Sequence, residues 1–322
     1  MGDTAAMTGF VARRLAQMVV VLFAVSVLTF LIFNVIPNGD PASRMAGKSP
    51  TESQVEAIRA EWGFDEPLPV QYVKTMEQVL GGSSISYFTQ LNVREEIVKG
   101  LPRTLSLAVG AAILWMTMGI ALGLLGALRA GRISDRLLTF LALAGVSLPV
   151  FWLGALMSYY LGFKAGWFPN GGYVPLTEDP LGWAYHLVLP CTALAILFIG
   201  FYSRVLRSSV LDTMSEDYVR TARAKGLSER QVLLRHVLRN SLIPIVTLWG
   251  LDFGAVVAGG AILTETVFDL QGVGQYAAES VGQLDVPPVL AVTLFGAFFI
   301  VVLNTIVDIV YAVLDPRIRV TT

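Results

Sequence analysis

The sequence predicts an all-helical membrane protein with six membrane-spanning helices and both termini on the cytoplasmic side. Only 15% of the 322 residues are charged and 54% are hydrophobic, whereas about a quarter of the residues of a soluble domain are charged. Six apolar stretches approach or exceed the roughly 20 residues that cross the hydrocarbon core of a bilayer. Basic residues are also concentrated in alternate connections between these stretches, as expected when they mark one side of a membrane.

The predicted spans lie at about 15–36, 105–128, 137–163, 187–202, 241–263 and 288–313. The fourth is short and contains Pro190, and the fifth contains Pro244. Proline is tolerated in a span where neighbouring helices satisfy the freed backbone groups. Arg13 and Arg14 precede the first stretch, which is longer than the apolar core of a signal peptide. We therefore expect an uncleaved first span, with a cleaved signal as the less favoured alternative.

The charges orient the spans. Most of the 23 Lys and Arg residues lie in the N-terminus, in 129–136, in 204–239 and in the C-terminal tail. The loops 164–186 and 264–287 hold Lys164 as their one basic residue beside six acidic ones. Short loops rich in Lys and Arg face the cytoplasm, so both termini are expected inside. The expected parts are 1–36 (cytoplasmic N-terminus and first span), 37–103 (extracytoplasmic subdomain), 104–315 (core with five spans) and 316–322 (cytoplasmic tail).

The extracytoplasmic part, 37–103, is too long for a simple connector. Its stretch "TESQVEAIRAEWG" predicts a helix that opens with a capping box of Thr51 and Gln54 and ends at Gly63. A surface lid packed on the spans is favoured here over a ligand site.

The sequence carries no pattern of an enzyme or of a metal site. Its two histidines, His186 and His236, are far apart, and no HExxH motif or Cys/His cluster is present. The phosphate-binding loop of ATPases is also missing. We therefore expect no catalytic residue, metal or cofactor on this chain, and energy for any transport must come from a gradient or another polypeptide.

The segment 204–239, "RVLRSSVLDTMSEDYVRTARAKGLSERQVLLRHVLRN", is the charged part of the core. Two helices are expected to meet at its corner, with Gly226 as a left-handed C-cap and Ser228 capping the next helix together with Gln231. Tyr218, Ala222 and Lys225 follow the spacing of one helix face. The residues alone allow two interpretations: a basic helix lying on anionic lipid, or a projection that docks into a soluble partner.

The stretch "DYVRTARAKGLSERQVLLRHVLRNSLIPIVT" resembles the cytoplasmic coupling segment, or EAA loop, of the membrane subunits of ABC importers. The Glu-Ala-Ala triplet of that loop corresponds to Arg220, Thr221 and Ala222 here, and only Ala222 matches it. The peptide/nickel subfamily shares this departure and the long distance from Gly226 to Pro244. "IPNGDPA", "GGAILTETVFDLQGVGQ", "DVPPVL" and "NTIVDIVYAVLDPRIR" are similar to further parts of that subfamily, although Gln271 stands where Pro is usual. The resemblance covers roughly residues 10 to 319.

This resemblance implies the type I ABC importer permease fold, in the cytoplasmic membrane of a prokaryote. It implies a second homologous permease chain, two cytoplasmic ATPase subunits that bind ATP and Mg, and an extracytoplasmic substrate-binding protein. The implied cargo is dipeptides or oligopeptides, with glutathione and nickel chelates left open. The 217–228 helix, within a coupling segment at 207–239, would contact the ATPase. The implied coupling residues are Asp217, Tyr218, Arg220, Thr221, Ala222, Lys225, Gly226, Leu227 and Ser228.

Asp252, Asn304 and Asp308 are polar residues that lie within predicted spans. Such groups are costly at membrane depth and usually face the bundle interior or an aqueous path. A hydrogen bond to another span is favoured over a role in lining the path. A gradient-driven carrier or channel that uses Asp252 and Asp308 is the alternative function, and it would predict inverted repeats. The 37–103 loop has no counterpart in the second half. A scaffold that recruits a cytosolic protein without transport is a third possibility.

Overall fold

The computed structural model describes residues 2–34, 41–46 and 50–314. These ranges are helical apart from turns and one isolated bridge between Ile85 and Asn92, and no strand occurs in them. The chain forms two compact units: Met1–Arg103 with Gln271–Val302 (unit 1), and Thr104–Leu270 with Leu303–Thr322 (unit 2). The two long helices α5 (Val93–Leu128) and α15 (Val286–Leu314) each run from one unit into the other.

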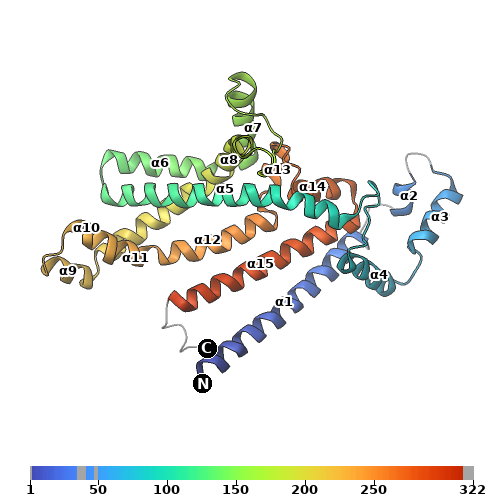
Figure 1. Ribbon diagram of the computed structural model, residues 1–322, viewed down its shortest axis with the longest axis horizontal. Helices are drawn as coiled ribbons and strands as arrows, with labels where there is room; N and C mark the ends of the chain where they lie inside the picture. The colour runs from blue at the N-terminus through green and yellow to red at the C-terminus, as the bar shows by residue number, and fades with distance from the viewer. Residues whose placement is uncertain (1, 35–40, 47–49, 315–322) are drawn as a thin grey trace. The chain divides into compact units, whose positions relative to one another are not determined.

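Within the described ranges, five helical segments are long and apolar enough to cross a membrane (Figure 1). Two of them lie within α1 (Gly2–Asn34) and α15, and the others are α5, α8 (Pro180–Met214), and α12 (Ile243–Ala255) together with η3 (Val256–Gly260). The five segments are Ala16–Phe33, Val93–Leu128, Pro180–Met214, Ile243–Gly260 and Val286–Ile306. They correspond to the first, second, fourth, fifth and sixth predicted spans. The predicted all-helical membrane fold is therefore confirmed.

The third predicted span, 137–163, is not one continuous helix. The chain forms α6 (Ile133–Ser147), then α7 (Val150–Met157), which continues as the π-helix η1 (Ser158–Lys164). The two parts are bent by 100°. Leu148 is extended, with ψ 132°, because it precedes Pro149, and proline disfavours the helical conformation of the residue before it. The described residues thus contain five candidate spans, or six if the bent pair counts as one.

Unit 1 contains α1, α2 (Pro41–Met45), α3 (Glu52–Trp62), α4 (Leu68–Gly81), α14 (Val273–Gln283) and the first parts of α5 and α15. The predicted start and end of α3 are confirmed. Thr51 and Gln54 form the capping box, and Gly63 closes the helix at φ 68°. Helix α4 is held on α1 by Tyr72, whose ring lies edge-on to Phe30 with centroids 5.4 Å apart.

Unit 2 is built on α8, which packs closely against α5 and α6. Small residues allow this approach. A Cβ at Gly123 of α5 would lie 2.8 Å from the carbonyl oxygen of Ser203 on α8. On the other side, a Cβ at Gly200 of α8 would collide with the carbonyl oxygen of Ala142 on α6. The backbone of α8 is therefore in direct contact with two other helices, which leaves little room for independent movement.

Candidate functional site

The charged corner of unit 2 begins where α8 ends. Helix α9 (Asp217–Ala224) follows after two residues, and α10 (Glu229–Gln231), η2 (Val232–Val237) and α11 (Leu238–Ser241) then form a continuous helical stretch. The turn between α9 and α10 has the predicted chemistry. Gly226 adopts φ 79°, and Ser228 and Gln231 form a reciprocal capping box. Both helix ends at this corner are thus satisfied by local hydrogen bonds, and the corner has a defined geometry.

Helix α9 has one buried side and one exposed side. Val219 and Ala222 are turned inward, with exposed fractions of 0% and 4%. Tyr218 is 41% exposed, and Lys225 is exposed as well. The expected common face of Tyr218, Ala222 and Lys225 is therefore divided, because the small Ala222 side chain fits against the protein. Ala222 fixes the helix, and the other two are accessible.

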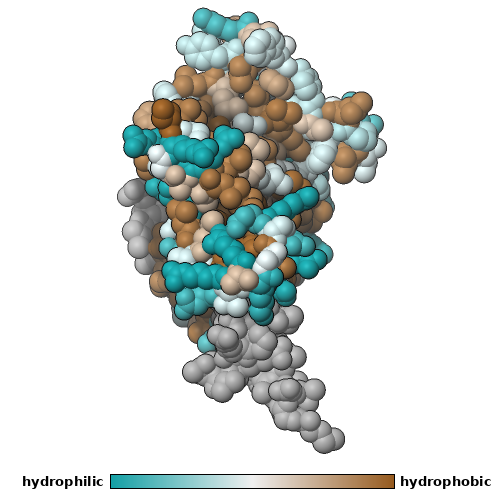
Figure 2. Space-filling model, turned by 90° about the vertical axis from the view of Figure 1, so that its left-hand side faces the viewer, coloured by the Kyte–Doolittle hydropathy of each residue, from teal (hydrophilic) through white to brown (hydrophobic). Residues whose placement is uncertain are grey.

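The exposed side is hydrophilic. Figure 2 views the molecule from the end that carries α9 and shows teal, hydrophilic residues gathered on this face. Arg220 pairs loosely with Asp217 at 3.4 Å, and Arg223 reaches across the corner to Glu229 at 3.0 Å. The remaining predicted coupling residues lie at the surface or just below it. Thr221, Lys225, Gly226 and Ser228 are exposed, and Leu227 is half-buried.

Two contacts hold this corner together, one within it and one to α8, and sequence reasoning missed both. Asn240 at the end of α11 donates its side-chain N–H to the Tyr218 hydroxyl at 2.7 Å. Ser209 of α8 and Ser241 of α11 each donate a hydroxyl to the carbonyl oxygen of the other at 3.2 Å. Ser241 is fully buried. The segment from α9 to α11 therefore leaves α8 and returns to it.

A partly buried ion pair lies close to this return point. Arg207 of α8 donates from Nε to Oδ1 of Asp135 at 2.7 Å, and from Nη2 to Oδ2 at 2.8 Å. The backbone N–H of Gly131 donates to Oδ2 at 2.9 Å. The Asp135 side chain is only 6% exposed. Asp135 is the one acidic residue among the arginines of 129–136. This pattern in the sequence could have indicated an ion pair at Asp135.

The three intramembrane polar residues have different surroundings. Asp252 of α12 accepts a hydrogen bond of 2.7 Å from the hydroxyl of Tyr202 on α8. The Tyr202 side chain is 1% exposed, so this bond joins two spans inside the protein. Asn304 is half-buried in α15. Asp308 follows it by one helical turn, and its side chain lies outside the described residues.

On unit 1, the loop after α4 is fixed to the junction between α14 and α15. Ser86 donates its hydroxyl to Oδ2 of Asp285 at 2.5 Å, and the Tyr87 N–H donates to Oδ1 at 3.0 Å. Asp285 is 1% exposed, and burial raises the pKa of its carboxyl. The Tyr87 ring lies edge-on to Trp62 and Phe64, with centroids 5.0 and 5.6 Å away. An aromatic cluster and a buried carboxylate thus hold this loop.

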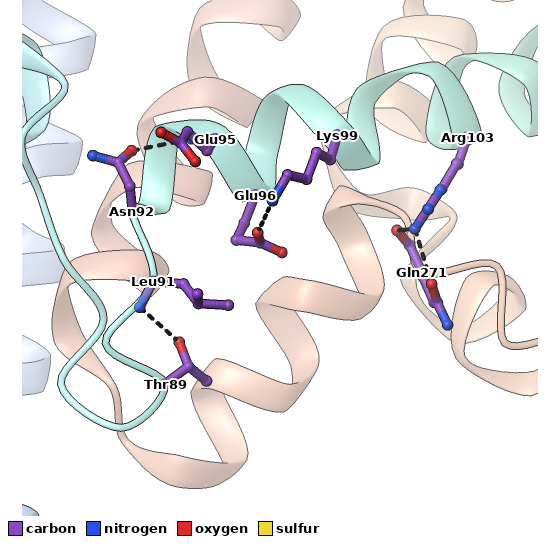
Figure 3. A network of polar contacts seen from close by, with 8 residues as sticks. All are labelled: Thr89, Leu91, Asn92, Glu95, Glu96, Lys99, Arg103 and Gln271. Atoms are coloured by element: carbon purple, nitrogen blue, oxygen red, sulfur yellow. Dashed lines mark hydrogen bonds and ion pairs between the residues drawn. The ribbon is translucent and has the colours of Figure 1, made fainter.

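A second polar network surrounds the start of α5 (Figure 3). Asn92 caps the helix by accepting the Glu95 N–H at 3.1 Å, and Lys99 pairs with Glu96 at 2.7 Å. Arg103 donates to the carbonyl oxygen of Gln271 at 2.9 Å and to its side-chain oxygen at 3.1 Å. These contacts join the start of α5 to the segment before α14.

Gln271 itself departs from the family pattern for a visible reason. It has φ 54°, and its N–H donates to the Gln275 side chain at 2.7 Å. Proline has φ near −65° and no N–H, so it fits neither feature.

The described residues contain no group of three or more His, Cys, Asp or Glu side chains that could hold a metal ion.

Comparison with known proteins agrees with this architecture. Residues 119–320 match the family described as "Binding-protein-dependent transport system inner membrane component", and residues 7–108 match the N-terminal region of such membrane components. The chain belongs to this family. It is a permease subunit of an ABC importer and a multi-pass protein of the prokaryotic inner membrane. In such importers partner subunits hydrolyse ATP, and a separate protein binds the substrate.

The permease is similar over its whole length to curated relatives. It is 38% identical to a probable peptide ABC transporter permease, y4tP of Sinorhizobium fredii, over 96% of this chain and 99% of that one. It is 35% identical to the di/tripeptide transport system permease DppB of Pseudomonas aeruginosa, over 97% and 99%. It is 37% identical to the glutathione transport system permease GsiC of Salmonella paratyphi A, also over 97% and 99%.

The fold of the permease is also found in a solved structure. The MetNI methionine ABC transporter in an inward-facing conformation matches with a TM-score of 0.55 and 16% identity, over 69% of this chain and 97% of that chain. This likeness concerns the fold alone, and it supports the type I ABC importer permease architecture.

Proposed function

We propose that the permease forms, with a second homologous permease chain, the path by which dipeptides or oligopeptides enter the cell. Two cytoplasmic ATPase subunits would bind ATP and Mg, and an extracytoplasmic protein would deliver the peptide. The relatives' names support a peptide cargo, because they name peptides, di- or tripeptides and glutathione, itself a tripeptide. A dipeptide or oligopeptide is the cargo we favour among these.

We further propose that α9 is the helix that couples the permease to an ATPase. The observation that carries this proposal is the division of α9 into a buried and an exposed side, next to a capped corner. Burial of Val219 and Ala222 holds the helix in place. The exposed Tyr218, Arg220 and Lys225 can then enter a groove of a partner. A helix held this firmly can transmit a movement of the partner without absorbing it.

The proposed orientation places α9 and both termini in the cytoplasm. It rests on the distribution of Lys and Arg, which are concentrated in 129–136 and 204–239 and almost missing from 164–186 and 264–287. The segment 37–103 would then face outward as an extracytoplasmic subdomain. Its loop at Ser86 and Tyr87, fixed by Asp285, would offer the binding protein a stable surface.

The test uses the whole transporter, purified through a tag on this chain and placed in proteoliposomes with its binding protein and a labelled dipeptide. Arg220→Glu reverses a charge on the exposed side of α9. We expect a fall of at least about tenfold in dipeptide import, with less ATPase subunit co-purified. Arg129→Glu, an exposed charge reversal outside α9, is the matched control and should retain import.

Two outcomes would contradict the proposal. Unchanged import in Arg220→Glu would mean that α9 does not couple transport to the ATPase. If the variant instead retains the ATPase but loses affinity for vesicles of anionic lipid, α9 is a lipid-binding helix.

A further inference from the structure

The ion pair between Asp135 and Arg207 is partly buried and bidentate: the Asp135 side chain is 6% exposed and that of Arg207 32%. Both guanidinium contacts are short, and a backbone N–H adds a third donor to the carboxylate. Buried ion pairs contribute little net stability, because desolvation of the charges offsets their attraction. A bidentate contact between a planar guanidinium and a carboxylate does impose one relative orientation on the two groups. The pair is therefore better suited to fix a geometry than to stabilise the fold.

The pair joins three helices at one point. Arg207 belongs to α8, and Asp135 lies in the first turn of α6. The end of α5 lies against both, since a Cβ at Gly126 would come within 3.3 Å of Arg207 Cδ and 3.6 Å of Asp135 Oδ1. A larger residue than glycine would therefore press on the ion pair. At this point α8 is bonded to α6 through the ion pair and packs against the end of α5.

The same stretch of α8 carries both ends of the α9–α11 segment. Ser209, two residues beyond Arg207, makes the reciprocal hydrogen bonds with Ser241 of α11. In the other direction α8 reaches α9 through Ser215 and Glu216 alone. The N–H groups of these two residues bond back to Asp212 and Thr213, at 3.1 and 3.2 Å. The connection is short and fixed by hydrogen bonds, so we expect a displacement of α9 to move the end of α8 as well.

We propose that Asp135 and Arg207 form a mechanical link that transmits the movement of α9 from α8 to α6 and α5. Both are positioning residues: neither contacts ATP or peptide, and both act through the orientation of the spans. This inference rests on the proposed coupling function of α9. It adds to that function the route by which movement leaves the coupling helix.

Arg207→Lys is the principal test, because lysine keeps the charge and cannot form the bidentate contact. The assay is the number of labelled dipeptides imported per ATP hydrolysed, in proteoliposomes containing the whole transporter. We expect normal assembly with the ATPases, near-normal basal ATP hydrolysis, and a fall of roughly 2- to 30-fold in import per ATP. Lys74→Gln, which removes an exposed ion pair with Glu66 on unit 1, is the control and should leave the ratio unchanged.

The double variant Asp135→Leu with Arg207→Met separates transmission from folding. Apolar pairs often replace buried ion pairs without loss of stability, so we expect a wild-type melting temperature and still a low import per ATP. The exchanged pair, Asp135→Arg with Arg207→Asp, restores opposite charges and should recover part of the ratio. A wild-type ratio in Arg207→Lys or in the apolar pair would overturn the inference.

The two proposals fail in different ways. If Arg220→Glu leaves import intact, the coupling role of α9 fails. If Arg220→Glu abolishes import and Arg207→Lys leaves import per ATP unchanged, the coupling role stands and the mechanical link fails. Should Arg207→Lys not assemble, the apolar pair decides the question by the same ratio.

Discussion

The side-chain N–H of Asn240 donates to the hydroxyl of Tyr218 at 2.7 Å, and this bond ties the first turn of α9 to the end of α11. The two residues are 22 positions apart, so the bond closes the whole charged corner into a loop. Asn240 also donates to the carbonyl oxygen of His236 at 3.1 Å, which holds its amide in place.

Tyr218→Phe removes this bond and keeps the ring. Both residues are exposed, so we expect a change in unfolding free energy of no more than about 0.5 kcal/mol. We expect faster amide hydrogen exchange in 217–224, because α9 loses a contact to the rest of the corner. Hydrogen exchange measured by mass spectrometry checks this, with Tyr160→Phe as a control outside the corner. Identical exchange in α9 of both variants would show that Val219 and Ala222 alone hold the helix.

Gly226 should be replaceable only by residues that tolerate a left-handed backbone. At φ 79° a β-branched residue is strained, and non-glycine residues cost roughly 1–2 kcal/mol in this region. A Cβ at this position meets no atom within 4 Å, so the strain is of the backbone alone. Gly226→Val should therefore reduce coupled import strongly, and Gly226→Asn much less. Gly166, with φ 64° and equally open space, gives the matched pair of controls outside α9.

The Tyr202–Asp252 bond should have a measurable coupling energy. In a double-mutant cycle with Tyr202→Phe and Asp252→Asn, we expect roughly 0.6 kcal/mol and at most about 1.7, the range found for hydrogen bonds between spans. Unfolding in mixed micelles provides the free energies. Dipeptide import should survive Asp252→Asn, because the carboxylate serves as an interhelical contact. Loss of import with an intact fold would instead show that transport itself needs the Asp252 carboxylate.

Asp285 should give the permease a pH-dependent stability. Burial raises its folded pKa above the ordinary value of 3.8, and the donors Ser86 and Tyr87 offset only part of this rise. Between 3.8 and the raised pKa, the folded state binds more protons than the unfolded state, so the free energy of unfolding falls as pH rises. Asp285→Asn removes this titration. The melting temperature of the wild type relative to this variant should therefore decrease from pH 3.5 to 7.

The tyrosines beside Asp285 do not disturb this measurement. Burial first, and then the charge of Asp285, raises the pKa of both Tyr87 and Tyr276 above 10. Both side chains remain neutral throughout the pH range. A difference between wild type and variant that is constant with pH would show that Asp285 does not titrate in this window.

Gln271→Pro should destabilise the permease. The change removes the N–H bond to Gln275 and is incompatible with φ 54°. We expect a loss of about 1–3 kcal/mol, as for other residues forced from their native backbone conformation. Thermal unfolding in detergent measures the loss. Gln271→Gly, which tolerates the backbone angle, should retain more of the stability, and the opposite order would contradict this account.

The sequence by itself determined the local features of the permease. The spans follow from apolar runs of sufficient length, because the bilayer thickness sets that length. The capping boxes at Thr51 and Ser228 and the left-handed turns at Gly63 and Gly226 follow from residues within three or four positions of one another. Such features depend on neighbouring backbone groups, and these are present in the sequence.

Only the tertiary structure decided which side of α9 is buried and which distant residues meet. Helical spacing placed Ala222 on one face with Tyr218, and packing against the protein buried it instead. Asp135 and Arg207 are 72 residues apart, and their meeting requires α6 to lie against α8. Each arginine of 204–239 looks alike in the sequence. Packing of α8 against α6 turns the side chain of Arg207 toward Asp135, whereas Arg220 and Arg223 pair only with carboxylates of the charged corner.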